Sequence, residues 1–202
     1  MSDESKLSTR RETLVKIAGA VTAANLAQPL MSQTDAEHVH KAAAAATPAG
    51  GPYKPRLFTP QEFKTLQMLS EIIVPGATKG NTAEFIDYLS SNNKELAAIF
   101  TGGLAWLDAT MQKRANAKFV DAKPAERTAL LDIIAYRRNA QSNPEMMPGI
   151  RFFTWARRMA VDGYYTSAAG IKEIGFKGNG ASAKFEVKQE LYDQVLKKAG
   201  YA

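Results

Sequence analysis

The sequence of 202 residues contains no cysteine. This absence excludes disulfide bonds, thiolate metal sites, a cysteine nucleophile and the covalent attachment of haem c to this chain. A chain without cysteine fits the cytosol, and it fits equally well a protein that folds before export and needs no oxidative cross-link. Cysteine content therefore limits the chemistry of the protein without assigning its compartment.

Histidine is nearly absent too, because only His38 and His40 occur. The chain from Leu57 onward therefore cannot form a Ser-His-Asp triad or a zinc site of histidines and cysteines. It also has no side chain that ordinarily titrates near neutral pH. The two histidines lack a nearby third ligand, so we predict solvated side chains. We expect no catalytic residue, no cofactor-binding residue and no metal ligand in this chain.

A nucleotide-binding loop is also missing. The string from Gly178 to Ala183 has the spacing GxGxxA of a dinucleotide-binding turn. That turn works inside a βαβ unit, and the 19 residues after Ala183 are too few to complete one. We interpret the string as a loop.

No apolar run is long enough to cross a membrane. The stretch from Ile17 to Met31 is interrupted by three polar residues and by Pro29, whereas a transmembrane helix needs about 20 mostly apolar residues. A weak apolar stretch of this kind is, however, typical of an export signal that follows a pair of arginines.

The residues before that stretch resemble a twin-arginine export signal. Arg10, Arg11 and Leu14 match its pattern, whereas Thr13 stands where phenylalanine is usual and Val15 where lysine is usual. We predict export to the periplasm by the twin-arginine pathway. An amphipathic N-terminal helix is the alternative. A nucleic-acid-binding arm is disfavoured because the first 52 residues contain no Phe, Trp or Tyr to stack on a base.

The chain divides into two parts by composition. Residues 32–56 are rich in Ala, Pro and Gly and show no periodicity, which predicts a linker. We therefore assign residues 1–56 to a twin-arginine-type signal and its linker, and residues 57–202 to a helical domain.

Helix signals dominate from residue 57 onward. Thr59, Pro60 and Glu62 form a capping box with proline at the first helical position, and Pro75 and Gly76 end that helix. No β-hairpin signal or alternating strand of sufficient length occurs. The sequence therefore predicts an all-α fold, an irregular bundle of about five to seven helices. We expect a helix after Asn81, which can cap it. The other helices are expected at 60–74, at 94–118, from 124, across 152–159, at 168–174 and at 187–198.

Charged residues are predicted to cap helices or to face the solvent. From residue 57 onward there are 19 Lys+Arg and 15 Asp+Glu, a net charge of 19 − 15 = +4. This mild excess and the lack of aromatic residues between the basic pairs disfavour nucleic acid as a partner. Acidic residues are expected to cap helices or lie on solvated faces. They are Glu84, Asp87, Asp108 and Glu126.

The stretch from Phe152 to Phe176 contains six aromatic residues. Tyr164 and Tyr165 follow Gly163, where we expect the helix to end, so the two rings leave in different directions. One ring can enter the core, and the other would lie on the surface as an amphipathic anchor. Two half-buried tyrosines that pack a corner are the alternative.

Four motifs of the helical domain are similar to the gluconate 2-dehydrogenase subunit 3 family. They are IIVPG at 72–76, FID at 85–87, GGLAWLDATM at 102–111 and FFTWARRMAVDGYYTSAAGIKEIGFKG at 152–178. The most specific part is GYYTS with the aromatic-glycine loop that follows it. The resemblance covers about residues 57–180.

This resemblance implies a non-catalytic small (gamma) subunit of a bacterial, membrane-associated flavin dehydrogenase. In that family the small subunit carries the twin-arginine signal and escorts a GMC-type large subunit that binds FAD. A multihaem cytochrome c with haem c usually takes the electrons onward. The resemblance therefore implies no cofactor in this chain and a position in the periplasm, peripheral to the inner membrane. The substrate of the complex would be a sugar or polyol of the gluconate or glucose type.

The partner surface is expected on the aromatic stretch, and the resemblance implies that this partner is the flavin subunit. The predicted interface residues are Phe152, Trp155, Tyr164, Tyr165, Ser167 and Phe176. Alanine at both tyrosines should weaken the complex without unfolding the subunit.

Two other functions stay open at this stage. A standalone periplasmic helical protein that binds a small ligand would need an apolar pocket with convergent polar groups. A basic nucleic-acid-binding domain would show salt-sensitive DNA binding by residues 57–202. Two departures from the family also matter: the loop after Pro75 is short, and the tail after Gly180 is a charged helix by its pattern.

Overall fold

A computed structural model describes residues 33–45, 47, 51–178 and 188–200. Within these ranges every regular element is a helix and no strand occurs. The predicted all-α fold is therefore confirmed. The predicted signal residues Arg10, Arg11 and Leu14 lie outside the described residues.

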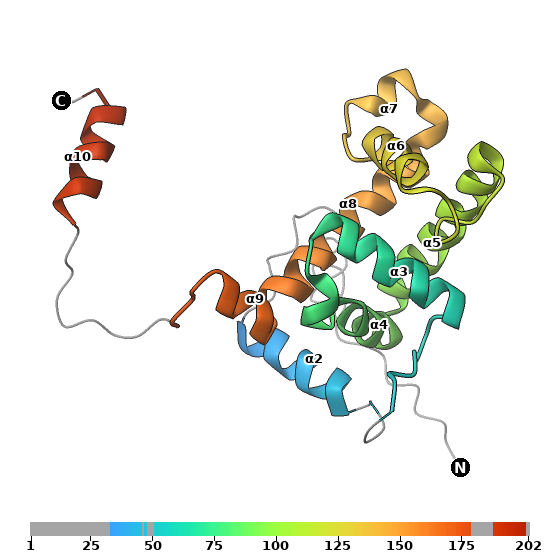
Figure 1. The fold of residues 1–202 in the computed structure, drawn as a ribbon, viewed down its shortest axis with the longest axis horizontal. Helices are drawn as coiled ribbons and strands as arrows, with labels where there is room; N and C mark the ends of the chain where they lie inside the picture. The colour runs from blue at the N-terminus through green and yellow to red at the C-terminus, as the bar shows by residue number, and fades with distance from the viewer. Residues whose placement is uncertain (1–32, 46, 48–50, 179–187, 201–202) are drawn as a thin grey trace, which may run out of the picture.

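The body of the protein is a bundle around the long helix α8 (Met147–Tyr165), which packs against α4 (Thr82–Asn92) and α5 (Lys94–Ala115) (Figure 1). Helix α3 (Pro60–Ile73) crosses this group, and α6 (Pro124–Ile134) lies beside α8. The centre of the core is aromatic and aliphatic and excludes water. Its largest side chains with almost no exposure are Phe85, Phe100, Phe119, Leu66, Leu69, Ile86, Leu104, Leu107, Met111, Leu130 and Ile134.

The helix ends follow their capping residues. Thr59 Oγ1 accepts the Glu62 N–H at 3.3 Å, and a Glu62 carboxylate oxygen accepts the Thr59 N–H at 2.9 Å, so the predicted capping box is confirmed. Asn93 Oδ1 accepts two N–H groups in the first turn of α5. Helix α5 ends three residues earlier than predicted, because Asn116 adopts a left-handed conformation with a φ of 52°.

The prediction of an irregular linker is wrong for residues 33–45. They form helix α2 (Gln33–Ala45), which packs on α4. Alanine is the strongest helix former, and small side chains allow two helices to approach closely. Ala36 and Ala43 are both buried in this contact, so the alanine content that suggested a linker is instead the basis of the packing.

The region between α6 and α8 also differs from its prediction as a loop. It contains the short helix α7 (Asn139–Ser142) and a 3₁₀ turn, η2 (Pro144–Met146), and α8 begins directly after that turn. With α2 and α7 added to the seven predicted helices, the described residues contain nine α-helices.

Helix α8 does not end at Gly163 as predicted but continues to Tyr165. A Cβ atom at Gly163 would lie 3.0 Å from the ring of Phe85 and 3.1 Å from the methyl group of Thr82. The glycine therefore serves close packing of α8 against α4, and the backbone stays helical.

Adjacent glycines in α5 give a prediction with an internal control. A Cβ at Gly103 would lie 2.0 Å from the buried ring of Phe152, whereas a Cβ at Gly102 meets nothing within 4 Å. Gly103→Ala should therefore cost about 1–3 kcal/mol of the free energy of unfolding through overpacking. Gly102→Ala should gain up to about 1 kcal/mol, because alanine is the better helix former. Urea denaturation of both variants measures the contrast, and equal stabilities would contradict the packing of α5 on α8.

Two small helices follow α8 among the described residues. Helix α9 (Ala168–Glu173) packs against α8 and a 3₁₀ turn, η1 (Ala77–Gly80). Helix α10 (Gln189–Lys198) confirms the predicted C-terminal helix, and it lies apart from the body (Figure 1).

Candidate partner-binding surface

The GYYTS motif forms the turn between α8 and α9, which we call the α8–α9 corner (residues 163–167). Tyr164 is 3% exposed, and its ring packs directly against Gly76 and Gly80 of the η1 region. Its hydroxyl donates a hydrogen bond to the Glu173 carboxylate. This hydrogen bond, together with burial, raises the pKa of Tyr164 to about 12. The tyrosine therefore joins three elements from inside the chain.

The two polar residues of the motif complete the corner. The Ser167 hydroxyl donates to the Tyr164 carbonyl at 2.6 Å and accepts the Gly170 N–H at 3.2 Å, which caps α9. The Thr166 hydroxyl donates to the Asp162 carbonyl at 2.6 Å. The hydroxyls of Tyr164, Thr166 and Ser167 thus all bond within this region, which supports a structural role for the motif.

The six residues of the predicted partner interface differ in their exposure to solvent. Phe152, Tyr164 and Ser167 are 4%, 3% and 5% exposed, so their side chains face the interior of this chain. A place for these three residues in a partner interface stays a prediction, although little of their side-chain area is accessible. Accessible area is left on three of the six predicted residues, and contact with a partner through them stays a prediction. They are Trp155, Tyr165 and Phe176.

Asp87 is buried, whereas the sequence predicts that it caps a helix or lies on a solvated face. Its carboxylate has no exposure and accepts the Tyr53 hydroxyl at 2.7 Å. It also accepts three consecutive backbone N–H groups, from Arg56 at 2.7 Å, Leu57 at 3.1 Å and Phe58 at 3.3 Å. Burial and the hydrogen bond to Asp87 raise the pKa of Tyr53. Asp87 therefore ties the segment before α3 onto α4.

A second carboxylate fixes the short turn after α3. Glu71 accepts the Gly76 N–H at 2.7 Å, and it accepts the Thr78 N–H at 2.9 Å and the Thr78 hydroxyl at 2.8 Å. The N–H donor of Thr78 is the main cause of the lowered pKa of Glu71. The loop after Pro75 is thus short but ordered by one side chain, and it presents Gly76 to Tyr164.

His40 is not the solvated residue that the sequence predicts. Its ring centroid lies 4.7 Å from that of Phe85, and its Nε2 lies 3.0 Å from Thr166 Oγ1. His38 is exposed as predicted. Helix α2 is thereby linked to the α8–α9 corner through one histidine.

The contact of His40 predicts a pH dependence of stability. Burial lowers the pKa of His40 below its usual value of 6.5, so protonation favours the unfolded state. The free energy of unfolding should fall as the pH drops below about 6.5. Glu84 lines one cavity together with His40. Burial raises the pKa of Glu84, so this group acts on stability in the opposite direction.

Thermal unfolding of His40→Gln at pH 7.5 and pH 5.5 separates the effect of His40 on stability from the effect of Glu84. The variant should lose less stability than the wild type on acidification, whereas His38→Gln should lose as much as the wild type. Identical pH profiles for the wild type and His40→Gln would contradict the contact.

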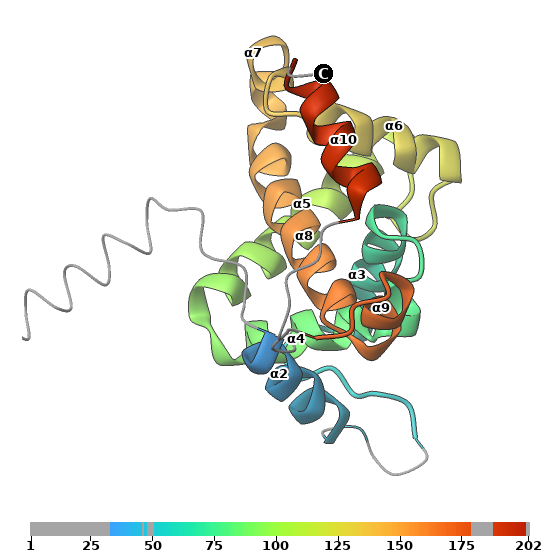
Figure 2. The same cartoon turned by 90° about the vertical axis from the view of Figure 1, so that its left-hand side faces the viewer.

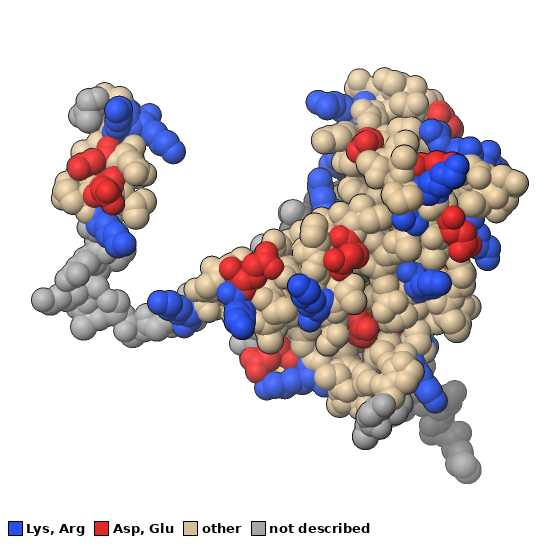
Figure 3. All heavy atoms as spheres, viewed as in Figure 1, with Lys and Arg blue, Asp and Glu red and all other residues tan. Residues whose placement is uncertain are grey.

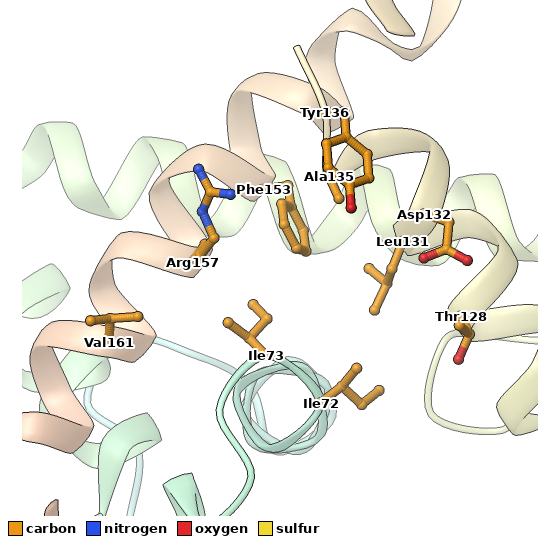
Figure 4. Close-up of a pocket in the computed structure, with 10 residues that line it drawn as sticks. All are labelled: Ile72, Ile73, Thr128, Leu131, Asp132, Ala135, Tyr136, Phe153, Arg157 and Val161. Atoms are coloured by element: carbon orange, nitrogen blue, oxygen red, sulfur yellow. The ribbon is translucent and has the colours of Figure 1, made fainter. Parts of the chain in front are cut away.

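An apolar groove opens between α3, α6 and α8 (Figure 4). Its volume is about 380 Å³. Apolar side chains form most of its walls, and Arg157 and Asp132 lie on opposite sides of it. We call this the α3–α6–α8 groove. Its lining residues are Ile72, Ile73, Thr128, Leu131, Asp132, Ala135, Tyr136, Phe153, Arg157 and Val161.

Charge is mixed on the face of the molecule that Figure 3 shows, where basic and acidic side chains alternate. No group of residues in the described ranges could hold a metal ion. Among the helices that the structure describes, none is long and apolar enough to cross a membrane.

These features define a small all-α protein with a rigid aromatic corner and apolar surface left uncovered. The chain belongs to the gluconate 2-dehydrogenase subunit 3 family, whose model matches residues 60–180. The match begins at α3 and includes the α8–α9 corner, so the resemblance seen in the sequence is confirmed. Comparisons with curated proteins and with solved structures give no match. The family is that of a subunit, which implies at least one partner chain.

Proposed function

We propose that this chain is the non-catalytic small subunit of a periplasmic, membrane-associated, FAD-dependent dehydrogenase of sugars or polyols. The family match over residues 60–180 is the observation that carries this proposal. In this assignment FAD belongs to a GMC-type large subunit and haem c to a multihaem cytochrome. The small subunit stabilises the large one, and it associates with the membrane only through the complex.

The proposal includes an escort role in export. Arg10, Arg11 and Leu14 would direct this chain to the twin-arginine pathway, which carries folded proteins. A large subunit without a signal of its own would cross while bound to it. Such a role requires a firmly folded binding surface, and the α8–α9 corner with its satisfied hydrogen bonds supports that requirement.

The contact surface is proposed on the accessible aromatic residues of the stretch from Phe152 to Phe176. Trp155 and Tyr165 are half-buried, which fixes their rings while leaving area for a partner. Phe176 is 41% exposed in the chain after α9. Aromatic residues held in this way are typical anchors of protein–protein interfaces.

Export of the two chains can be tested together in the native host. Arg10→Lys with Arg11→Lys should remove this chain from the periplasm and remove a flavoprotein without its own signal at the same time. Quantitative mass spectrometry of the periplasmic fraction measures both losses. The matched control is Arg137→Lys with Arg138→Lys, an exposed basic pair of the body, which should leave both chains in place. Loss of this chain alone would refute the escort role.

A further inference from the structure

Exposed large apolar side chains gather in three places in the described part of the chain. The first is the rim of the α3–α6–α8 groove, with Ile72 at 40%, Tyr136 at 52% and Val161 at 38% exposure. The second is the chain after α9, with Ile174 and Phe176. The third is α10, with Leu191 at 54%, Tyr192 at 54% and Val195 at 60% exposure. The groove and α10 thus carry six of the eight exposed large apolar side chains in the described residues.

Helix α10 exposes an apolar face to solvent. Leu191, Tyr192, Val195 and Leu196 share one face by their i, i+1, i+4, i+5 spacing. An isolated helix shorter than about 12–15 residues is marginal in water, and α10 has 10 residues. Its stability therefore depends on packing of the apolar face against another surface.

The groove offers an apolar surface of suitable form on the same chain. Ile72 and Ile73 come from α3, Leu131 from α6, and Phe153 and Val161 from α8, so its walls are themselves helices (Figure 4). An amphipathic helix laid into a groove between helices buries its apolar face there.

The connection is long enough to bring the helix to the groove. Fifteen residues, 174–188, separate the end of α9 from the start of α10, and a fully extended chain of that length spans up to about 50 Å. Figure 2 views the molecule from the side on which α10 lies, and α10 stands in front of the region where α3, α6 and α8 meet. Figure 1 shows that α10 and the body are separated along that direction.

The charged side chains of α10 and of the groove favour one orientation of α10 in the groove. Arg157 lies on the α8 side of the groove with Val161, toward the corner from which the tether starts, and Asp132 lies on the α6 side. Helix α10 carries Glu190 and Asp193 in its first half and two lysines in its last turn. An approach with the first half beside Arg157 brings opposite charges together at both ends.

We propose that α10 folds back onto its own chain and fills the α3–α6–α8 groove, with its first half beside Arg157 and its last turn beside Asp132. The helix then buries Leu191, Val195 and the groove rim in one step. This inference does not depend on the identity of the dehydrogenase.

The sequence contains no cysteine, so no native thiol can compete with two introduced cysteines in a cross-linking test. In the full-length chain, Val161→Cys with Leu191→Cys should form an intramolecular disulfide under mild oxidation. The Cα atoms must approach to about 4.4–6.8 Å for this bond. The matched control is Val161→Cys with Gln194→Cys, since Gln194 lies on the polar face of α10, and it should cross-link to a much smaller extent. Mass spectrometry and a non-reducing gel measure both.

Amide hydrogen exchange gives a second measurement that needs no cysteine. Val195→Asp on α10 and Ile72→Asp in the groove should each accelerate exchange of the α10 amides by at least about tenfold relative to the wild type. Disulfide-linked dimers in place of monomers would overturn the proposal in favour of a second copy. Exchange of α10 that is as fast in the wild type as in both variants would also overturn it, because the helix would then be undocked.

Discussion

Asp87→Ala is expected to destabilise the protein by about 3–5 kcal/mol. Removing the shared acceptor leaves several donors without a partner, and each donor that stays desolvated costs about 1–3 kcal/mol. In this protein the groups left behind are the Tyr53 hydroxyl and three backbone N–H groups before α3. Total stabilities of small domains are about 5–15 kcal/mol, so the loss should be visible directly in the urea midpoint.

Two further variants separate the carboxylate from general effects of substitution. Asp87→Asn keeps the shape of the side chain but turns an amide N–H₂ toward donors, so it should also destabilise strongly. Asp108→Ala removes a carboxylate for which the described residues supply one hydrogen bond, from the Phe119 N–H at 3.1 Å, and it should cost only about 1 kcal/mol. Equal effects of Asp87→Ala and Asp108→Ala would contradict the proposed anchoring of the segment before α3.

Tyr164→Ala should cost about 3–5 kcal/mol of the free energy of unfolding, as for other truncations of a buried aromatic ring. The ring lies between α8 and the η1 turn, where a Cβ at Gly76 would already be 3.0 Å from the tyrosine oxygen. The cavity left by the truncated ring would stay unfilled, because the neighbouring Gly76 and Gly80 have no side chains that could move into it.

Two further variants separate the structural role of Tyr164 from a role of Tyr165 in partner binding. Tyr164→Phe loses only the hydrogen bond to Glu173 and should cost about 1 kcal/mol. Tyr165→Ala should leave stability within about 1 kcal/mol of the wild type and weaken partner binding. The double alanine variant is therefore expected to lose stability as well as binding, because its first substitution removes the buried ring of Tyr164. Unchanged stability of Tyr164→Ala would contradict the burial of this ring.

Local signals in the sequence predicted the helices well. The capping box at Thr59, the start of α5 after Asn93 and the extent of α10 depend on residues a few positions apart, which a single sequence displays directly. Asn81 is an exception: it precedes α4 as predicted, but it has a φ of 50° and its side chain makes no cap hydrogen bond. The tight turn after Gly76 sets that backbone conformation.

Long-range contacts could not be predicted in the same way. Asp87 meets donors about 30 residues away, and His40 meets Thr166 at a separation of 126 residues. An acidic residue on a helix and a histidine in an alanine-rich stretch look solvated until the partner segment is placed beside them. The corner shows the same limit, because the sequence displayed two adjacent tyrosines without deciding which one enters the core.

The most direct test of the proposed function is to isolate the tagged chain from the periplasm of its native host and to record an absorption spectrum and the masses of bound proteins. The proposal predicts a yellow complex with flavin bands and a GMC-type large subunit, and haem bands if the cytochrome stays bound. Screening of sugars and polyols against that complex would then identify the substrate. A colourless chain that is recovered alone would contradict the subunit role and would favour a standalone ligand-binding protein.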